Sequence, residues 1–229
     1  MSAIIKQIEM GKTNAYLIKS EKGYILVDAG MPGESDKIEK VLVENNISLK
    51  DIQLIIITHV HYDHVGSLSV LKDKTGAAVL VHEKEKEFLE KGKTDFPEGT
   101  VFISKLISKL SNLISESKFK AVNPDITIKD NYDLKQYGVN GEIIHTPGHT
   151  RGSISVIING EDIICGDTLF NFMPHSVYPP FANDKKQLIK SWKKIEKYNC
   201  KRFYPGHGSI FTKEKFIKTL AKKAKKLDA

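Results

Sequence analysis

The chain contains little cysteine, arginine or tryptophan. Its 229 residues include two cysteines, one tryptophan and two arginines, Arg151 and Arg202. Two cysteines are too few for a disulfide framework. No apolar run approaches the ~18 residues that a membrane-spanning helix needs, and the first residues lack the basic and apolar segments of a signal peptide. We therefore expect a cytoplasmic protein with no membrane span.

The basic charge does not indicate a specific nucleic-acid partner. The formal net charge is +7 and the pI is near 9.1, but the excess is almost wholly lysine. These lysines are spread through predicted helices and the C-terminal segment, as solvated faces would be. A length of 229 residues with 40% hydrophobic residues fits a single domain with an ample core.

One short stretch concentrates potential metal ligands. Leu54-Ile55-Ile56-Ile57 predicts a buried strand, and it leads into Thr-His-Val-His-Tyr-Asp-His at 58–64. His59 and His61 lie two residues apart, so in extended backbone they point to the same side. Asp63 and His64 follow where the chain turns into an apolar-periodic helix. Two groups of ligands aimed differently suit two adjacent metal ions; the alternative is a solvated loop capped by Asp63.

Three later positions can complete such a site. His149, Asp167 and His207 each follow a short predicted strand, and each has glycine or proline beside it, where the backbone must turn sharply. The strand ends are therefore expected to assemble one rim of ligands.

This pattern resembles the metallo-β-lactamase superfamily over nearly the whole chain. The matching motifs are His-x-His-x-Asp-His at 59–64, the Gly-His of 148–149, the Gly-Asp of 166–167, the Gly-His-Gly of 206–208 and the Asp-Ala-Gly of 28–30. The resemblance implies an α/β fold, a four-layer αβ/βα sandwich formed by residues 1–229, with the metal site at the edge between its two sheets.

The resemblance also implies roles for individual residues. The first metal would be held by His59, His61 and His149, and the second by Asp63, His64 and His207, with Asp167 bridging both. Asp63 and Asp167 would be the catalytic carboxylates, and Asp28 would orient the ligand loop through hydrogen bonds.

Such a site would hold two divalent metal ions. Imidazole and carboxylate ligands suit zinc best, and iron or manganese also accept them. A hydroxide shared by the two ions would attack the carbonyl of a small-molecule thioester or lactone, as in the glyoxalase II and lactonase branches that the chain resembles. No Gly-x-Ser-x-Gly elbow indicates a serine nucleophile. Only 22 residues follow His207, too few for the glutathione-binding helical domain of glyoxalase II, so a glutathione thioester is not expected.

Three alternatives remain open on the sequence alone. A tRNA-processing metallonuclease shares the motif, although the chain shows no protruding Gly/Pro-rich arm. A persulfide dioxygenase with mononuclear iron keeps much of the pattern. A metal-binding protein without catalytic activity is the third alternative.

Two segments are expected to determine specificity. Residues 83–120 form a predicted helical insertion in which Ile103, Leu106 and Ile107 recur at helical spacing. This insertion could be a lid or a homodimer contact, or a helix packed on the sandwich. The aromatic and proline-rich loop at 171–183 offers Phe172, His175 and Tyr178 as substrate contacts; alternatively, its aromatics fill the core.

Overall fold

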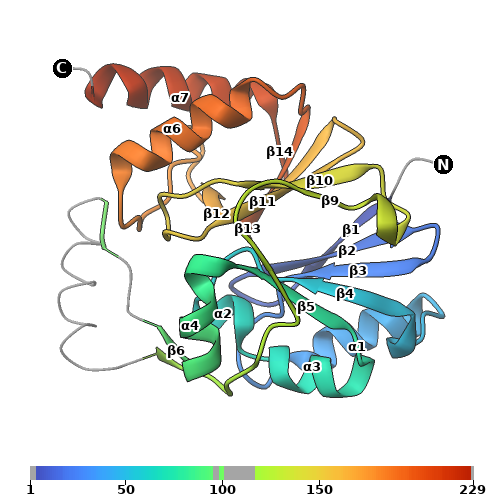
Figure 1. Ribbon diagram of the computed structural model, residues 1–229. Helices are drawn as coiled ribbons and strands as arrows, with labels where there is room; N and C mark the ends of the chain where they lie inside the picture. The colour runs from blue at the N-terminus through green and yellow to red at the C-terminus, as the bar shows by residue number, and fades with distance from the viewer. Residues whose placement is uncertain (1–3, 95–97, 101–116, 228–229) are drawn as a thin grey trace.

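Two six-stranded sheets pack face to face between two layers of helices (Figure 1). The computed structural model describes residues 4–94, 98–100 and 117–227. This arrangement confirms the predicted four-layer αβ/βα sandwich. Most of the predicted helix at 96–120 lies outside the described residues. Within those residues, no helix is long and apolar enough to cross a membrane.

The first sheet has the strand order β1-β2-β3-β4-β5-β8. Its strands are β1 (Ile5–Glu9), β2 (Asn14–Ser20), β3 (Gly23–Val27), β4 (Ile52–Ile56), β5 (Ala78–His82) and β8 (Ile126–Ile128). Strands β1 to β3 run antiparallel, and β3, β4, β5 and β8 run parallel.

The second sheet has the order β14-β13-β12-β11-β10-β9. Its strands are β9 (Tyr132–Asp133), β10 (Gly141–His145), β11 (Ile154–Ile158), β12 (Asp162–Asn171), β13 (Arg202–Gly208) and β14 (Phe211–Thr212). Neighbours in this sheet are antiparallel except for β12 and β13, which are parallel. A separate pair joins β6 (Lys93–Thr94) to β7 (Ser117–Lys118).

The strand that delivers the ligand motif is buried on both faces. Ile55 and the following Ile57 pack under the outer helices, whereas Leu54 and Ile56 pack into the core between the two sheets. Alternate side chains of a strand point to opposite faces, so a continuous apolar run is what a doubly covered strand requires. The run at 54–57 therefore places the end of β4 deep inside the sandwich.

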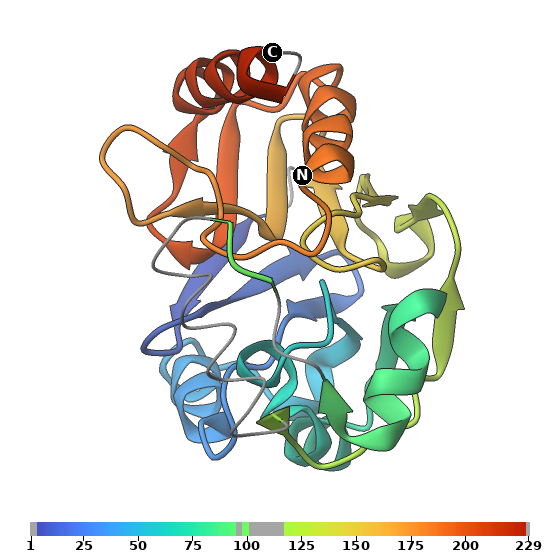
Figure 2. The same cartoon turned by 90° about the vertical axis from the view of Figure 1, so that its left-hand side faces the viewer.

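The helices cover the two outer faces of the sandwich (Figure 2). On the first sheet lie α1 (Ser35–Glu44), α3 (Leu68–Thr75) and α4 (Glu83–Lys91), which bury residues such as Ile38, Leu71 and Leu89. On the second lie α6 (Lys185–Glu196) and α7 (Lys213–Leu227), which bury Trp192 and Phe216. Short 3-10 helices at Leu49–Asp51 and Lys135–Tyr137 complete the described elements.

The helix predicted after the ligand motif is interrupted. A short helix α2 (Tyr62–Val65) ends at Gly66, and α3 starts at Leu68. The Gly66 N–H donates to the Gly30 carbonyl at 2.8 Å. A Cβ at Gly66 would lie 2.1 Å from the Pro32 nitrogen. The helix is therefore broken where the 30–32 turn passes against it, which ties that turn to the ligand motif.

Candidate metal centre

The loop after β4 is held by a buried carboxylate. Asp28 has φ of 63°, a left-handed conformation that Asp and Asn adopt more readily than most residues. Its Oδ1 accepts the Thr58 backbone N–H at 2.8 Å, and its Oδ2 accepts the Thr58 hydroxyl at 2.8 Å. Its Oδ2 also lies 2.9 Å from Nδ1 of His64. Asp28 therefore connects the first residue of the motif to the last.

Three imidazoles form the first cluster. Nε2 of His59, Nδ1 of His61 and Nε2 of His149 lie 3.0, 3.1 and 3.2 Å from one another. All three side chains are buried. For metal–nitrogen bonds of about 2.0–2.1 Å, ligands in a tetrahedron stand about 3.3 Å apart. The spacing of the three nitrogens thus fits a single ion at their centre.

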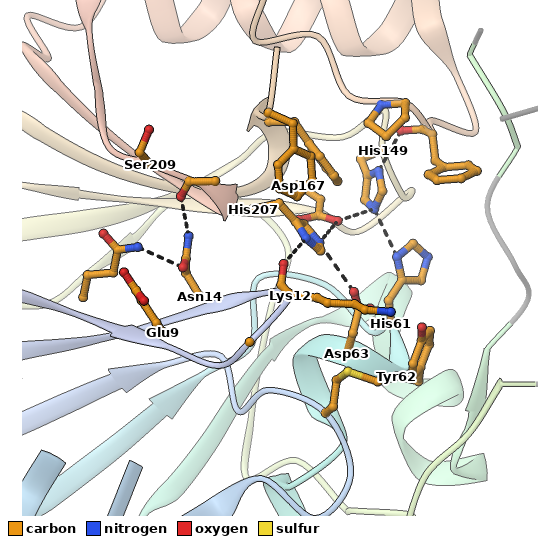
Figure 3. Close-up of a pocket in the computed structure, with 18 of the residues that line it drawn as sticks. Glu9, Lys12, Asn14, His61, Tyr62, Asp63, His149, Asp167, His207 and Ser209 are labelled. Carbon is orange, nitrogen blue, oxygen red and sulfur yellow. Dashed lines mark hydrogen bonds and ion pairs between the residues drawn. The ribbon is translucent and has the colours of Figure 1, made fainter. Parts of the chain in front are cut away.

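The second cluster contains Asp63, His64 and His207. Nε2 of His207 lies 3.4 Å from Oδ2 of Asp63, and ligand atoms of all three residues lie within 4.8 Å of one another. The sequence-predicted ligands therefore converge as two groups from both halves of the chain. Figure 3 shows five of them, namely His61, Asp63, His149, Asp167 and His207.

Asp167 faces both clusters. Its Oδ2 is 3.7 Å from His59 Nε2 and 3.4 Å from His149 Nε2, in the first cluster. The same oxygen is 3.3 Å from His207 Nε2, and Oδ1 is 3.2 Å from His64 Nε2, in the second. Asp167 lies inside β12, where irregular pairing with β13 separates Gly166 from Phe170. That irregularity turns the carboxylate toward the end of β4.

Hydrogen bonds on the outer side of the rings show which nitrogen of each imidazole faces the cluster. Nδ1 of His149 donates to the Phe181 carbonyl at 3.0 Å, and Nδ1 of His207 donates to the Lys12 carbonyl at 2.7 Å. With Nδ1 of His64 directed to Asp28, each of the three rings turns its Nε2 inward, where a neutral ring presents a lone pair. This is the protonation that metal ligation requires.

Two inward atoms have no hydrogen-bond partner. Nε2 of His64 and Oδ1 of Asp167 are buried, lie 3.2 Å apart and lack partners among the described residues. With a neutral His64 the two atoms are acceptors and repel each other, so either a shared proton or a cation must lie between them, because buried polar atoms are rarely left unpaired. A cation at this position would satisfy both, so the donor set fits the divalent ions typical of this arrangement.

The pKa values of these histidines reflect their burial and the charges beside them. Burial and the neighbouring His149 lower the pKa of His61 to about 3. Burial also lowers the pKa of His59 and of His149. Burial opposes protonation of His207 as well, but Asp167 and Asp63 raise its pKa to about 9. The imidazoles of the first cluster are therefore uncharged near neutral pH, whereas His207 in the second carries a proton that a bound cation would displace.

Glycine beside the ligands permits close approach. A Cβ at Gly206 would lie 2.2 Å from Asp167 Oδ1 and 2.8 Å from His64 Cε1. A Cβ at Gly166, where φ is +47°, would lie 2.5 Å from the Thr58 hydroxyl oxygen. Gly206 is thus required by packing against two ligands, and Gly166 by packing against the first residue of the ligand loop.

A cavity of about 630 Å³ opens onto both clusters. Its described lining includes His61, Asp63, His149, Asp167 and His207 together with an apolar group, namely Met31, Tyr62, Phe170, Phe172, Pro180 and Phe181. Phe170 stacks on His207 with ring centroids 4.5 Å apart. An apolar ligand group could therefore bind directly beside the candidate metal positions.

The three aromatic residues predicted to contact substrate are placed differently. Phe172 is 59% exposed and lines the cavity. His175 is exposed and is not among the lining residues. Tyr178 packs edge-on against Trp192 at 5.7 Å, and the Lys223 ammonium lies over its ring. The structure thus brings only Phe172 of the three to the cavity.

Two features near the clusters carried no distinct sequence signal. Glu85 in α4 is buried and bonds to the backbone of both ligand loops, although its neighbours suggest an ordinary charged helix. His82 and His145 stack on each other with ring centroids 4.0 Å apart. The contacts of Glu85 and the stacking of His82 on His145 both join residues distant in the sequence. Only the position of Glu85 in the first turn of a helix that follows a strand could have suggested its contacts.

Comparison with known proteins agrees with this geometry. The model of the metallo-beta-lactamase superfamily matches residues 9–207. A probable metallo-hydrolase of Methanocaldococcus jannaschii is 35% identical over 202 residues, covering 86% of this chain and 88% of that protein. The hydroxyacylglutathione hydrolase of Pelagibacter ubique is 28% identical over 208 residues, covering 87% and 71%.

The fold itself recurs among solved structures. A metallo-beta-lactamase of Cronobacter sakazakii superposes with a TM-score of 0.72, covering 98% of this chain and 90% of that one. Sequence identity over this match is 20%, so the likeness concerns the fold.

Proposed function

Because the chain belongs to the metallo-beta-lactamase superfamily of metallo-hydrolases, we propose that it hydrolyses small thioesters or lactones with two divalent metal ions, most suitably zinc. The placement of Asp167, whose carboxylate oxygens lie 3.2–3.7 Å from ligand nitrogens of both clusters, is the observation that carries this proposal. One carboxylate between two cations offsets part of their repulsion, which favours a paired site over a single ion. The hydroxyacylglutathione hydrolase among the relatives supports thioesters as one substrate class.

Bound ions would supply a polarised carbonyl and an activated water. The residues of this chain supply the rest. Asp63 is the more accessible carboxylate, with 18% of its side chain exposed. Although burial opposes ionisation, His64 and His207 lower the pKa of Asp63 to about 2, so it stays an anion at the edge of the cavity. From there it can orient a water molecule and accept a hydrogen bond from it.

The cavity also indicates the form of the substrate. Its apolar wall suits an acyl chain or an aromatic group, and Lys12 is the one lysine or arginine among the described lining residues. No hydrogen bond or ion pair involves the Lys12 ammonium within the described part of the chain. Figure 3 shows this side chain extending toward Asp63. Two divalent ions also carry more charge than two carboxylates neutralise, so we expect substrates with an anionic group.

A substrate panel tests the proposal. The zinc-loaded protein is assayed with thioesters, lactones, phosphodiesters and β-lactams, beside His61→Ala and beside protein stripped with a chelator. We expect turnover of thioesters or lactones that both treatments abolish. Turnover of the phosphodiesters alone would favour a nuclease, and persulfide oxidation with one bound iron would favour a dioxygenase. No metal-dependent turnover of any of these would favour a binding protein.

A further inference from the structure

Glu85 is a buried carboxylate without a cationic partner. Its side chain is 2% exposed, and no lysine, arginine or histidine of the described residues forms an ion pair with it. Burial accordingly raises its pKa. Placing a carboxylate in such a position is unfavourable unless hydrogen bonds replace the lost water, so the groups that it bonds identify its purpose.

Those groups belong to the two loops that carry the first histidine cluster. Oε2 of Glu85 accepts the Val60 N–H at 2.9 Å, and Val60 lies between His59 and His61. Oε1 accepts the Gly152 N–H at 2.8 Å, and the Thr150 side chain bonds to the same carboxylate. Thr150 and Gly152 follow His149 directly in the loop between β10 and β11.

The two loops come from opposite halves of the sandwich. The first follows β4 of one sheet, and the second joins β10 to β11 of the other. The Gly152 backbone comes so close that a Cβ there would lie 2.5 Å from Glu85 Cγ. A single side chain, with one oxygen on each loop, thus spans the gap that the cluster His59, His61 and His149 must close.

We propose that Glu85 is a positioning residue that sets the spacing of the first histidine cluster and thereby its affinity for metal. This inference rests on the proposed use of the clusters as metal sites. The second cluster has other supports, namely Asp28 for His64 and the Lys12 carbonyl for His207. Loss of the Glu85 bridge should therefore weaken one of the two metal sites and spare the other.

Glutamine at position 85 separates the loss of hydrogen bonds from a change in side-chain volume. An amide has nearly the volume of the carboxylate, but its NH₂ group cannot accept a hydrogen bond. Glu85→Gln must leave either the Val60 or the Gly152 N–H facing a donor. Glu85→Asp keeps the charge but is one methylene too short to reach both loops, so we expect no rescue by it.

The test measures metal affinity site by site. Zinc and cobalt(II) are titrated into metal-free protein against a chromophoric chelator, and the cobalt absorption bands are followed. His149→Ala and His207→Ala assign each binding step to the first or second cluster. In Glu85→Gln we expect the metal affinity of the step assigned to the first cluster to fall by about tenfold or more. The affinity of the step assigned to the second cluster should stay unchanged. Asp28→Asn should weaken the step assigned to the second cluster through His64, and a smaller loss at the first cluster is expected because Asp28 also bonds Thr58, which contacts His59.

The outcomes distinguish the inference from the proposed function. Unchanged affinity of the first step in Glu85→Gln would overturn the inference alone, as would equal weakening of both steps with a lower melting temperature of the metal-free protein. Failure of the wild-type protein to bind any metal would overturn the proposed function as well. If Glu85→Gln does not fold, Thr150→Val removes one of the three hydrogen bonds, and a selective, smaller loss at the first step is then the expected result.

Discussion

Replacing Asp28 by asparagine should weaken metal binding at the second cluster while leaving the fold intact. Asparagine tolerates the left-handed backbone at this position, so the change adds no strain. The carboxylate accepts three hydrogen bonds, from the Thr58 N–H, the Thr58 hydroxyl and Nδ1 of His64. An amide can retain at most one of its two acceptor positions.

The larger effect concerns the tautomer of His64. If the new NH₂ group faces the ring, Nδ1 must become the acceptor, and the proton moves to Nε2, the atom that faces Asp167 at 3.2 Å. A protonated Nε2 cannot bind a metal. Loss of such an outer contact weakens metal binding by about 10- to 100-fold, or about 1.4–2.7 kcal/mol.

Two measurements check this. Zinc competition with a chelator gives the affinity of each step, and long-range proton–nitrogen spectra of the imidazoles report which His64 nitrogen carries the proton. Asp36→Asn, an exposed aspartate in the first turn of α1, is the control for loss of one charge. Wild-type affinity in Asp28→Asn, with His64 still protonated on Nδ1, would refute this account.

Three further predictions follow from the same contacts. The pKa of His207 is raised to about 9 against an ordinary value near 6.5, so the stability from its ion pairs is complete below pH ~6.5 and is lost as the pH rises to about 9. The metal-free protein should therefore have a lower melting temperature at pH 9 than at pH 6.5. A higher melting temperature at pH 9 would contradict this. Gly206→Ala should abolish zinc binding because its Cβ would meet Asp167, whereas Gly160→Ala, with no atom within 4 Å, should not. Lys12→Met should raise KM about tenfold for a substrate bearing a carboxylate and leave its neutral amide analogue unchanged; equal effects on both would exclude a charge contact.

The sequence predicted the ligand residues, both those at one strand end and those distant along the chain, but not the side chains that hold them in place. His59, His61, Asp63 and His64 share one strand end, so their convergence follows from backbone geometry alone. The distant ligands were found through their glycine-containing motifs, which mark backbone that must approach something closely. The apolar run at 54–57 predicted one buried strand, whereas the four layers were expected from the resemblance to the metallo-β-lactamase superfamily.

Contacts of single side chains could not be predicted in this manner. Glu85 lies among charged residues of α4, and nothing in that pattern distinguishes the one glutamate that turns inward. The direction of Tyr178 depends on whether Trp192 is available 14 positions later, which is a property of α6 packing. The break at Gly66 likewise depends on the turn at 30–32 lying against it.

The N-terminal hairpin holds the last ligand of the chain. Nδ2 of Asn14 donates to the carbonyls of Pro205 and Gly208, on either side of His207, and the Tyr16 hydroxyl donates to Pro205 at 2.6 Å. The β1–β2 strands thus hold in position a segment almost two hundred residues downstream. Two fragments, one for each half of the chain, should not bind zinc separately and should bind it only after they are mixed. A one-residue deletion in the hairpin should prevent zinc binding by the mixture.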